Sequence, residues 1–250
     1  MIKDIEFFLK NIFFSEKFLL EKRLKRAIKN NYEKELSIIG NFTDKNKEAV
    51  DVGVYRGVYT YKLSKEFKHV HAFEPNPLIY PFLEKNLTKI VKNMTLKNLA
   101  LSDSNGDVNL RIPSRSKSIF KTNYEEIYKL GCATIHEGNK IDNKNNFKVK
   151  KIKLDDLLED KNISFVKIDV EGHEREVITG SKKIIKKNKP VLLVEIEERH
   201  NNFPILDTIE FIKNFGYNSY FVADGNVKDV KKLKDINSEN NFLFIAKKWQ

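Results

Sequence analysis

The stretch Ala49–Thr60, A-V-D-V-G-V-Y-R-G-V-Y-T, combines a carboxylate with two glycines in a pattern that suits a ligand site. Apolar residues lead into Asp51, Gly53 and Gly57 flank a turn, and an apolar run from Val58 can continue as a helix. A strand that bends through glycine into a helix leaves unpaired backbone N–H groups at the turn, with the positive end of the helix dipole behind them. Such a turn binds small polar groups, although a strand-turn-helix without a ligand shows the same pattern.

An acidic residue further along the chain favours a nucleoside as the ligand. Glu74 follows a second apolar run, Val70–Phe73, and stands 23 residues after Asp51. In α/β nucleotide-binding folds, an acidic residue about 20 residues beyond the turn accepts hydrogen bonds from ribose hydroxyls. The dinucleotide pattern G-x-G-x-x-G is absent, because Asp51 stands at its first position. A carboxylate repels a pyrophosphate and favours a cation, so the turn favours S-adenosylmethionine, which has a sulfonium and no phosphate, over NAD.

A second acidic stretch, Phe165–Gly172, offers groups for catalysis. Its apolar residues are typical of a buried parallel strand, which Lys167, Asp169 and Glu171 interrupt. The two acidic residues share one side of the strand if it continues, and they converge on the crevice if the chain turns near Val170. A buried carboxylate costs free energy unless it is paired or used. We therefore expect either reactive groups or a structural Lys–Glu pair.

The order of the predicted elements indicates a parallel α/β sheet. Ligands bind beyond the carboxyl ends of parallel strands, so Ser102 and Asp103 are expected near the adenine, unless they form an Asx-type turn before Gly106. Glu195 is another acidic residue at such an end. The insertion 108–153 is a place for substrate contacts, and His136 within it is interpreted as a surface histidine without a role. The predicted strands are 49–52, 70–73, 95–98, 165–170, 191–194, 217–222 and 241–247, and the predicted helices are 58–67, 78–90, 174–187 and 205–215.

The whole chain has 250 residues, enough for one domain with a substantial core. Its longest unbroken apolar run, Phe242–Ala246, is far shorter than the roughly 20 residues that cross a bilayer. Lys and Glu interrupt the N-terminus too often for a secretory signal peptide. Cys132 is the single cysteine, which excludes an internal disulfide and a cysteine metal cluster. A cytoplasmic location is expected.

The formal charge of +11 is spread along the chain, with one concentration near the N-terminus. Between Lys17 and Lys29, six basic residues accompany one acidic residue, and Leu20, Leu24 and Ala27 recur at helical spacing. This pattern predicts a basic amphipathic helix, which either covers the edge of its own domain or makes peripheral contact with a membrane or a partner. We predict a helical extension over residues 1–46 and a single α/β domain over residues 47–250, and the oligomeric state stays open.

Six motifs in order resemble the FkbM family of S-adenosylmethionine-dependent methyltransferases. They are V-D-V-G-x-x-x-G-x-Y-T, A-F-E-P-N-P, A-L-S-D, V-K-I-D-V-E-G-H-E, K-P-V-L-L-V-E-I and F-L-F-I-A, within residues 47–247. The resemblance implies a Rossmann-like class I methyltransferase fold, whose seven-stranded, mostly parallel sheet has an antiparallel last strand. It also implies O-methylation of a hydroxyl on a sugar, a glycan or another small molecule.

Carried over to this chain, the resemblance implies a cofactor turn, a ribose ligand and acidic residues beside the methyl group. Family members commonly have Ala-Asn-Ile where this chain has Val54-Tyr55-Arg56, so the contacts to the methionine end of the cofactor differ. The predicted cofactor-binding residues are Asp51, Gly53, Val54, Tyr55, Gly57, Glu74, Asn76, Ser102, Asp103 and Asp169.

Methyl transfer to a hydroxyl calls for a general base, and four residues are candidates for catalysis: Asp169, Glu171, His173 and Glu195. We favour Glu171 as the base and Asp169 as the residue that positions it. His173 begins a helix and is as well suited to a cap. A metal ion could polarise the hydroxyl instead, and the carboxylates permit one, but we assign no metal.

Two other classes of function stay open. The charge would suit a nucleic-acid methyltransferase, although the Pro-Pro-Tyr and Pro-Cys motifs of such enzymes are absent from the sequence. The second open class is a non-catalytic, membrane-associated protein with a degenerate methyltransferase fold. A NAD-linked oxidoreductase is the weakest alternative, because of the carboxylate in the turn.

Overall fold

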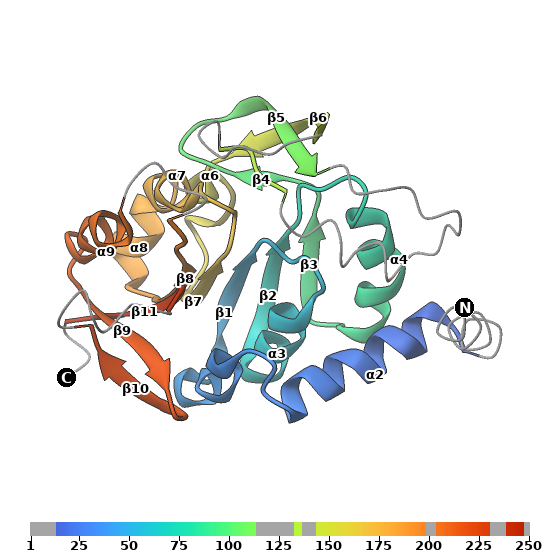
Figure 1. Ribbon diagram of the computed structural model, residues 1–250, viewed down its shortest axis with the longest axis horizontal. Helices are drawn as coiled ribbons and strands as arrows, with labels where there is room; N and C mark the ends of the chain where they lie inside the picture. The colour runs from blue at the N-terminus through green and yellow to red at the C-terminus, as the bar shows by residue number, and fades with distance from the viewer. Residues whose placement is uncertain (1–13, 114–132, 137–143, 199–203, 231–238, 248–250) are drawn as a thin grey trace.

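The computed structural model describes residues 14–113, 133–136, 144–198, 204–230 and 239–247 (Figure 1). Within them the chain forms a large sheet of eight strands and a small sheet of three. The large sheet has the order β10-β9-β11-β8-β7-β1-β2-β3. Its strands are β1 (Asp44–Val52), β2 (Phe67–Phe73), β3 (Met94–Lys97), β7 (Ile163–Ile168), β8 (Val191–Glu195), β9 (Tyr217–Ala223), β10 (Asn226–Asp229) and β11 (Asn241–Ala246).

The pairing of these strands confirms the predicted fold class. β3, β2, β1, β7 and β8 run parallel to one another, whereas β11 is antiparallel to both β8 and β9. The described sheet has eight strands where seven were predicted, because β10 folds back on β9 as a hairpin. Asp224 and Gly225 form its tip with φ of 54° and 72°, the left-handed conformation of a tight hairpin turn.

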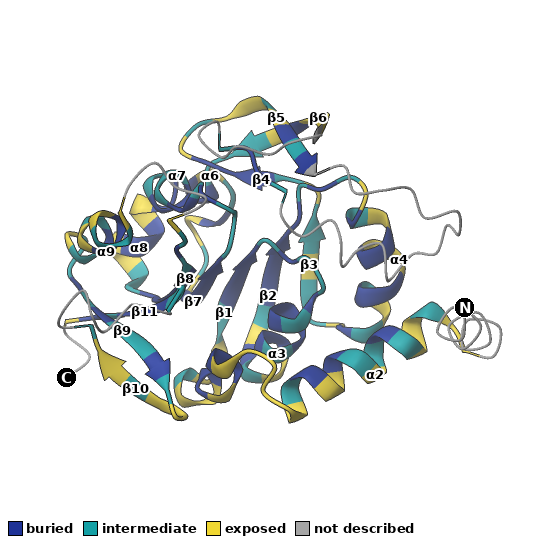
Figure 2. Ribbon diagram, in the orientation of Figure 1, coloured by how far each residue is buried: buried dark blue, intermediate teal, exposed yellow. Residues whose placement is uncertain are grey.

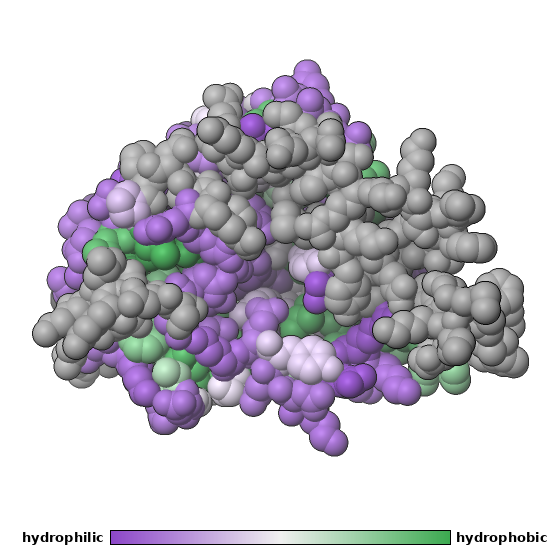
Figure 3. Space-filling view, viewed as in Figure 1, coloured by the Kyte–Doolittle hydropathy of each residue, from purple (hydrophilic) through white to green (hydrophobic). Residues whose placement is uncertain are grey.

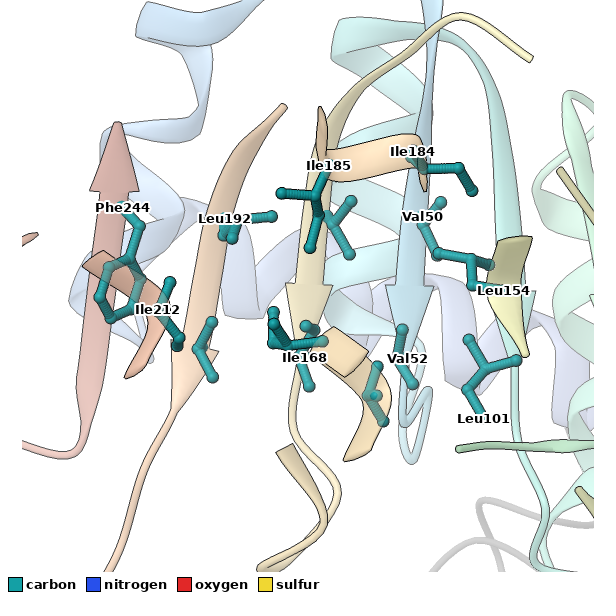
Figure 4. Close-up of a cluster of buried hydrophobic side chains, with 14 of the residues drawn as sticks. Val50, Val52, Leu101, Leu154, Ile168, Ile184, Ile185, Leu192, Ile212 and Phe244 are labelled. Atoms are coloured by element: carbon teal, nitrogen blue, oxygen red, sulfur yellow. The ribbon is translucent and has the colours of Figure 1, made fainter. Parts of the chain in front are cut away.

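Helices cover the two faces of the large sheet. Alternating strand residues point to opposite faces, so Ala49 packs in a cluster with α3, while Val50 packs with α8. Figure 4 shows the second cluster, in which Val50, Leu192 and Ile185 extend into the layer between strands and helix. β7 is accordingly buried along its whole length, and β1 and β2 are buried over their last four residues (Figure 2). The helices are α2 (Glu16–Lys29), α3 (Val58–Glu66), α4 (Tyr80–Ile90), α6 (Leu154–Leu158), α7 (Glu174–Thr179), α8 (Lys182–Asn188) and α9 (Ile205–Lys213).

The basic helix α2 packs on its own chain. Its apolar residues Leu20, Leu24 and Ala27 are buried, the first two in a cluster with residues of α3 and α4. In Figure 1, α2 runs along the lower edge of the molecule beneath these helices. Two short 3₁₀ helices, η1 (Lys34–Ser37) and η2 (Ile39–Phe42), then lead into β1. None of the described helices has the length and apolar character needed to cross a membrane.

The small sheet lies above the carboxyl ends of β1 and β2 in Figure 1, and it corrects one prediction. It consists of β4 (Ala100–Leu101), β6 (Lys144–Ile152) and β5 (Gly106–Pro113), in that order. The predicted strands do not include β4, which pairs in parallel with β6. This pairing joins residues about 50 positions apart, which local sequence cannot indicate. In the described segment 133–136, Thr134 forms an isolated bridge with Arg111.

The predicted helix over 174–187 is also divided, into α7 and α8, at Gly180 and Ser181. A Cβ placed on Gly180 would overlap the backbone oxygen of Ser102. The two helices therefore separate where the chain packs directly against the loop that follows β4.

Candidate functional site

A cleft of about 520 Å³ lies at the carboxyl ends of the parallel strands. This volume is within the range of about 300–1,000 Å³ found for small-molecule sites. Figure 3 shows a hollow near the middle of the molecule with hydrophilic residues around it. The glycine turn, the end of β2, the residues after β7 and the end of β8 all contribute to the cleft wall.

The glycine turn is held by close backbone contacts. Gly53 has a φ of 84°, and a Cβ on it would overlap the carbonyl oxygen of Asp169. Gly57 is the N-cap of α3 with a φ of 78°, and a Cβ there would lie 2.7 Å from Leu87, so this glycine lets the turn pack closely against α4. Between them Tyr55 takes a φ of 49°, a left-handed conformation that is unusual outside glycine and is found most often at functional sites.

Glu74, the predicted ribose ligand, lies at the end of β2 and faces the turn. Its Oε2 accepts a hydrogen bond from the backbone N–H of Tyr55 at 2.8 Å, and its Oε1 accepts one from that of Asn76 at 2.9 Å. Burial raises the pKa of Glu74 to about 7, although both hydrogen bonds favour the ionised form. All three residues line the cleft, and their contacts with a cofactor stay predictions.

Asp51 lies beneath the turn and not at its mouth. Its side chain is fully buried and accepts a hydrogen bond from the hydroxyl of Thr60 at 2.5 Å. Burial raises the pKa of Asp51 to about 6, against the opposing effect of the Lys167 ammonium 3.9 Å away. The structure thus places this carboxylate where it supports the turn from behind. Val54 is likewise buried, and a direct contact of either residue with the cofactor stays a prediction.

Lys167 connects the turn to the acidic residues after β7. Its ammonium group is 3.0 Å from the Asp169 carboxylate and donates a hydrogen bond to the carbonyl of Gly53 at 3.0 Å. Burial alone would lower the pKa of Lys167, but the charges of Asp169 and Asp51 raise it above its ordinary value. Lys167 therefore interacts with two aspartates, and the Lys–Glu pair that the sequence left open as an alternative is wrong in its partner.

The chain turns sharply after β7, as the second of our two alternatives required. β7 ends at Ile168, and Glu171 and Gly172 have φ of 56° and 103°. This turn brings Asp169 and Glu171 to the cleft wall together with Glu195 at the end of β8. All four residues proposed for catalysis, including His173, therefore line the same cleft.

Glu195 differs from the other acidic residues in its proton affinity. Burial raises the pKa of this group to about 10, and the nearby charge of Asp169 adds to the effect. Its Oε1 accepts a hydrogen bond from Asn240 at 2.8 Å. Glu195 is therefore protonated at neutral pH, which suits it to donate a hydrogen bond and not to remove a proton.

Ser102 and Asp103 are not among the described residues that line the cleft, but Ser102 contacts His173, which does line it. Ser102 is buried, and its hydroxyl is 2.9 Å from Nε2 of His173 and 3.3 Å from the carboxylate of Asp103, which is exposed. Burial lowers the pKa of His173, so the ring is neutral at pH 7. The predicted adenine contacts of Ser102 and Asp103 stay predictions.

Sequence reasoning missed two segments that line the cleft. Tyr32–Glu35 belongs to the predicted N-terminal extension. In the second segment, Asn240 precedes β11 and Asn241 is its first residue. Glu35 is buried, and burial raises its pKa to about 7. Neither segment has a recognisable motif, since both reach the cleft only through the tertiary fold.

The charge of the cleft is opposite to that of the chain. Among the described lining residues, Lys34 and Arg56 are the basic side chains besides His173. Six carboxyl groups face them: Glu33, Glu35, Glu74, Asp169, Glu171 and Glu195. An acidic cleft in a chain of formal charge +11 favours a cationic or neutral ligand over a phosphate-rich one.

A model of the methyltransferase FkbM domain matches residues 51–219, more than half of the chain. The chain belongs to the FkbM methyltransferase domain family. The match confirms the family that the sequence motifs predicted. It leaves Tyr32–Glu35 and Asn240–Asn241 of the cleft outside its range.

Several solved structures resemble this FkbM domain at low sequence identity. A methyltransferase FkbM from Methylobacillus flagellatus KT is 16% identical with a TM-score of 0.48, and the alignment covers 80% of this chain and 44% of that one. A SAM-dependent methyltransferase from Aquifex aeolicus is 12% identical, with 92% and 97% covered and a TM-score of 0.42. A putative methyltransferase from Streptococcus mutans, in complex with SAH, is 13% identical, with 84% and 90% covered and a TM-score of 0.35. The chain thus spans less than half of the Methylobacillus protein. No curated protein matches it.

Proposed function

We propose that this chain transfers the methyl group of S-adenosylmethionine to a hydroxyl of a sugar, a glycan or another small, neutral molecule. Family membership supports methyl transfer, and the acidic cleft supports this class of acceptor. Carboxylates accept hydrogen bonds from hydroxyl groups, whereas they repel phosphates. The six carboxyl groups of the cleft are the observation on which the proposal rests.

In this proposal the cofactor lies along the turn between Gly53 and Glu74. The carboxylate of Glu74 accepts hydrogen bonds from the ribose hydroxyls, and its neighbours Tyr55 and Asn76 bound the same part of the cleft. Asp169, whose carboxylate Lys167 holds in place, would bind the cationic methionine end. Orienting the methyl group and the acceptor for in-line displacement is worth about 7–11 kcal/mol.

Glu171 is the general base in this proposal. Glu195 is protonated at neutral pH, and Asp169 is held by the ammonium of Lys167, so neither is well suited to accept the proton. The acceptor oxygen attacks the methyl carbon as the carbon–sulfur bond breaks. The hydroxyl proton moves to Glu171, and the products are a methyl ether and S-adenosylhomocysteine.

Transfer of radiolabelled methyl from S-adenosylmethionine to a panel of neutral sugars and polyols tests the proposal. The purified chain should label at least one acceptor, and Glu171→Gln should lower that rate by about 10²- to 10⁴-fold with little change in affinity for S-adenosylhomocysteine. Glu84→Gln, an exposed change on α4, is the matched control and should keep full activity. Undiminished transfer by Glu171→Gln would refute the role of Glu171, and labelling confined to nucleic acid would refute the acceptor class.

A further inference from the structure

Two imidazoles and a carboxylate gather beside the cleft at a position that the proposed reaction does not use. His136 ends the described segment 133–136, and His173 and Glu176 lie at the start of α7. One potential ligand atom from each residue lies within 4.8 Å of the other two. Residues three apart at the start of a helix share a face, which explains why His173 and Glu176 point the same way.

One ring nitrogen of each histidine in this cluster is buried without a hydrogen bond to the described residues. Among the described residues, neither Nε2 of His136 nor Nδ1 of His173 has a hydrogen-bond partner, and both atoms are buried. Nδ1 of His173 is 3.6 Å from Oε2 of Glu176, which is too long for a hydrogen bond. Buried polar atoms are normally paired, so two unpaired imidazole nitrogens beside one carboxylate indicate a missing ligand.

The other nitrogen of His173 is fixed by a hydrogen-bond chain. The Ser102 hydroxyl donates to the Asp103 carboxylate at 3.3 Å, so it accepts from the Nε2–H of His173 at 2.9 Å. This tautomer, assigned from the network, leaves a lone pair on Nδ1, the atom that faces Glu176. Histidines that bind metal ions are usually oriented in this way by a second hydrogen bond.

We propose that His136, His173 and Glu176 bind a divalent transition-metal ion such as Zn²⁺. Two imidazole nitrogens and one carboxylate oxygen suit zinc, whereas Mg²⁺ and Ca²⁺ prefer oxygen ligands. With ligand bonds of about 2.0–2.1 Å, tetrahedral ligands lie about 3.4 Å apart. The 3.6 Å between His173 and Glu176 is close to that spacing. Three protein ligands leave a fourth position for water.

The ion would join two parts of the cleft wall. Ile135, next to His136, and His173 both line the cleft, and the hydroxyl of Thr134 already donates a hydrogen bond to the carbonyl of Glu171. Metal binding would therefore fasten the segment 133–136 to the chain after β7. This inference goes beyond the proposed methyl transfer and does not depend on it.

Titration of the full chain with Zn²⁺, after treatment with a chelator and in competition with a chromogenic one, tests the site. One equivalent should bind, and His136→Ala and Glu176→Gln should each weaken binding at least tenfold. Co²⁺ in place of Zn²⁺ should give the visible absorption of a tetrahedral site, which both variants should lose. His69→Ala is the matched control, because His69 lies on β2 with its Nε2 bonded to the hydroxyl of Thr95, and it should bind as the unmodified chain does.

Absence of stoichiometric binding, or equal binding by His136→Ala, Glu176→Gln and the unmodified chain, would overturn the site. Thermal unfolding of each variant in metal-free buffer shows whether it is folded, and Glu176→Gln changes a partly exposed side chain with little effect on packing. Titration of the same metal-free samples with S-adenosylhomocysteine separates a failure of the metal site from a failure of the proposed function.

Discussion

The buried carboxyl group of Glu74 accepts hydrogen bonds from two backbone N–H groups, and burial raises its pKa to about 7. The ionised carboxylate accepts hydrogen bonds at both oxygens, whereas the protonated form carries a proton on one of them. The proposed contact with the ribose hydroxyls therefore requires a pH above this pKa. The ionised fraction rises about tenfold from pH 6 to pH 8, and the affinity for S-adenosylhomocysteine should rise by a similar factor. Calorimetric titration across this range measures it.

The variant Glu74→Gln separates the effect of Glu74 ionisation on this affinity from the effect of Asp51 ionisation, because the pKa of Asp51 is about 6. The affinity of the variant should be lower at pH 8 and should lose most of its dependence on pH. The same tenfold rise in Glu74→Gln would show that another group is responsible.

At the scale of elements, the contact between the glycine turn and the chain after β7 fixes the shape of the cleft. Gly53→Ala places a Cβ against the Asp169 carbonyl and forces a φ of 84° on an alanine. We expect a loss of about 2–4 kcal/mol in the free energy of unfolding. The melting temperature should fall by roughly 5–15 °C, with a loss of cofactor affinity.

Gly40→Ala is the matched control for this change. A Cβ on Gly40 meets nothing within 4 Å, so its effect on unfolding should stay within about 0.5 kcal/mol. Equal melting temperatures of the two variants in thermal unfolding would contradict the account of the turn.

The parallel sheet could be predicted because its strands are apolar runs that end in acidic residues. Glu74 and Glu195 were found in this way, since each follows an apolar strand directly. β10 was missed although Asp224-Gly225 is a hairpin signal, because the strand it begins is polar and mostly exposed. β4 depends on a partner about 50 residues away, and the local pattern gives no sign of it.

The candidate site was predictable only where it coincides with strand ends. Tyr32–Glu35 reaches the cleft because α2 and η1 pack against the domain, and His136 meets His173 through contacts between distant segments. The spacing of residues in the sequence indicates neither of these tertiary contacts. We interpreted His136 as a surface histidine, whereas the structure places its ring 6.5 Å from that of His173 with a buried nitrogen.

The chain as a whole has a formal charge of +11, whereas carboxyl groups predominate over basic groups in the cleft lining. Any binding of RNA or DNA should therefore be non-specific, and it should weaken steeply as salt rises from 50 to 200 mM. It should also leave the affinity for S-adenosylhomocysteine unchanged. Gel mobility at several salt concentrations, with and without that compound, measures both effects. Binding that survives 200 mM salt and is coupled to the cofactor would instead favour a nucleic-acid acceptor.

The central claim is that the acidic cleft takes a cationic adenosine compound rather than a pyrophosphate. Parallel calorimetric titrations of the full chain with S-adenosylmethionine and with NAD at pH 8 test it most directly. The account predicts one equivalent of S-adenosylmethionine bound, weakened in Glu74→Gln, and no saturable binding of NAD. Saturable binding of NAD in the same cleft, without affinity for S-adenosylmethionine, would contradict it.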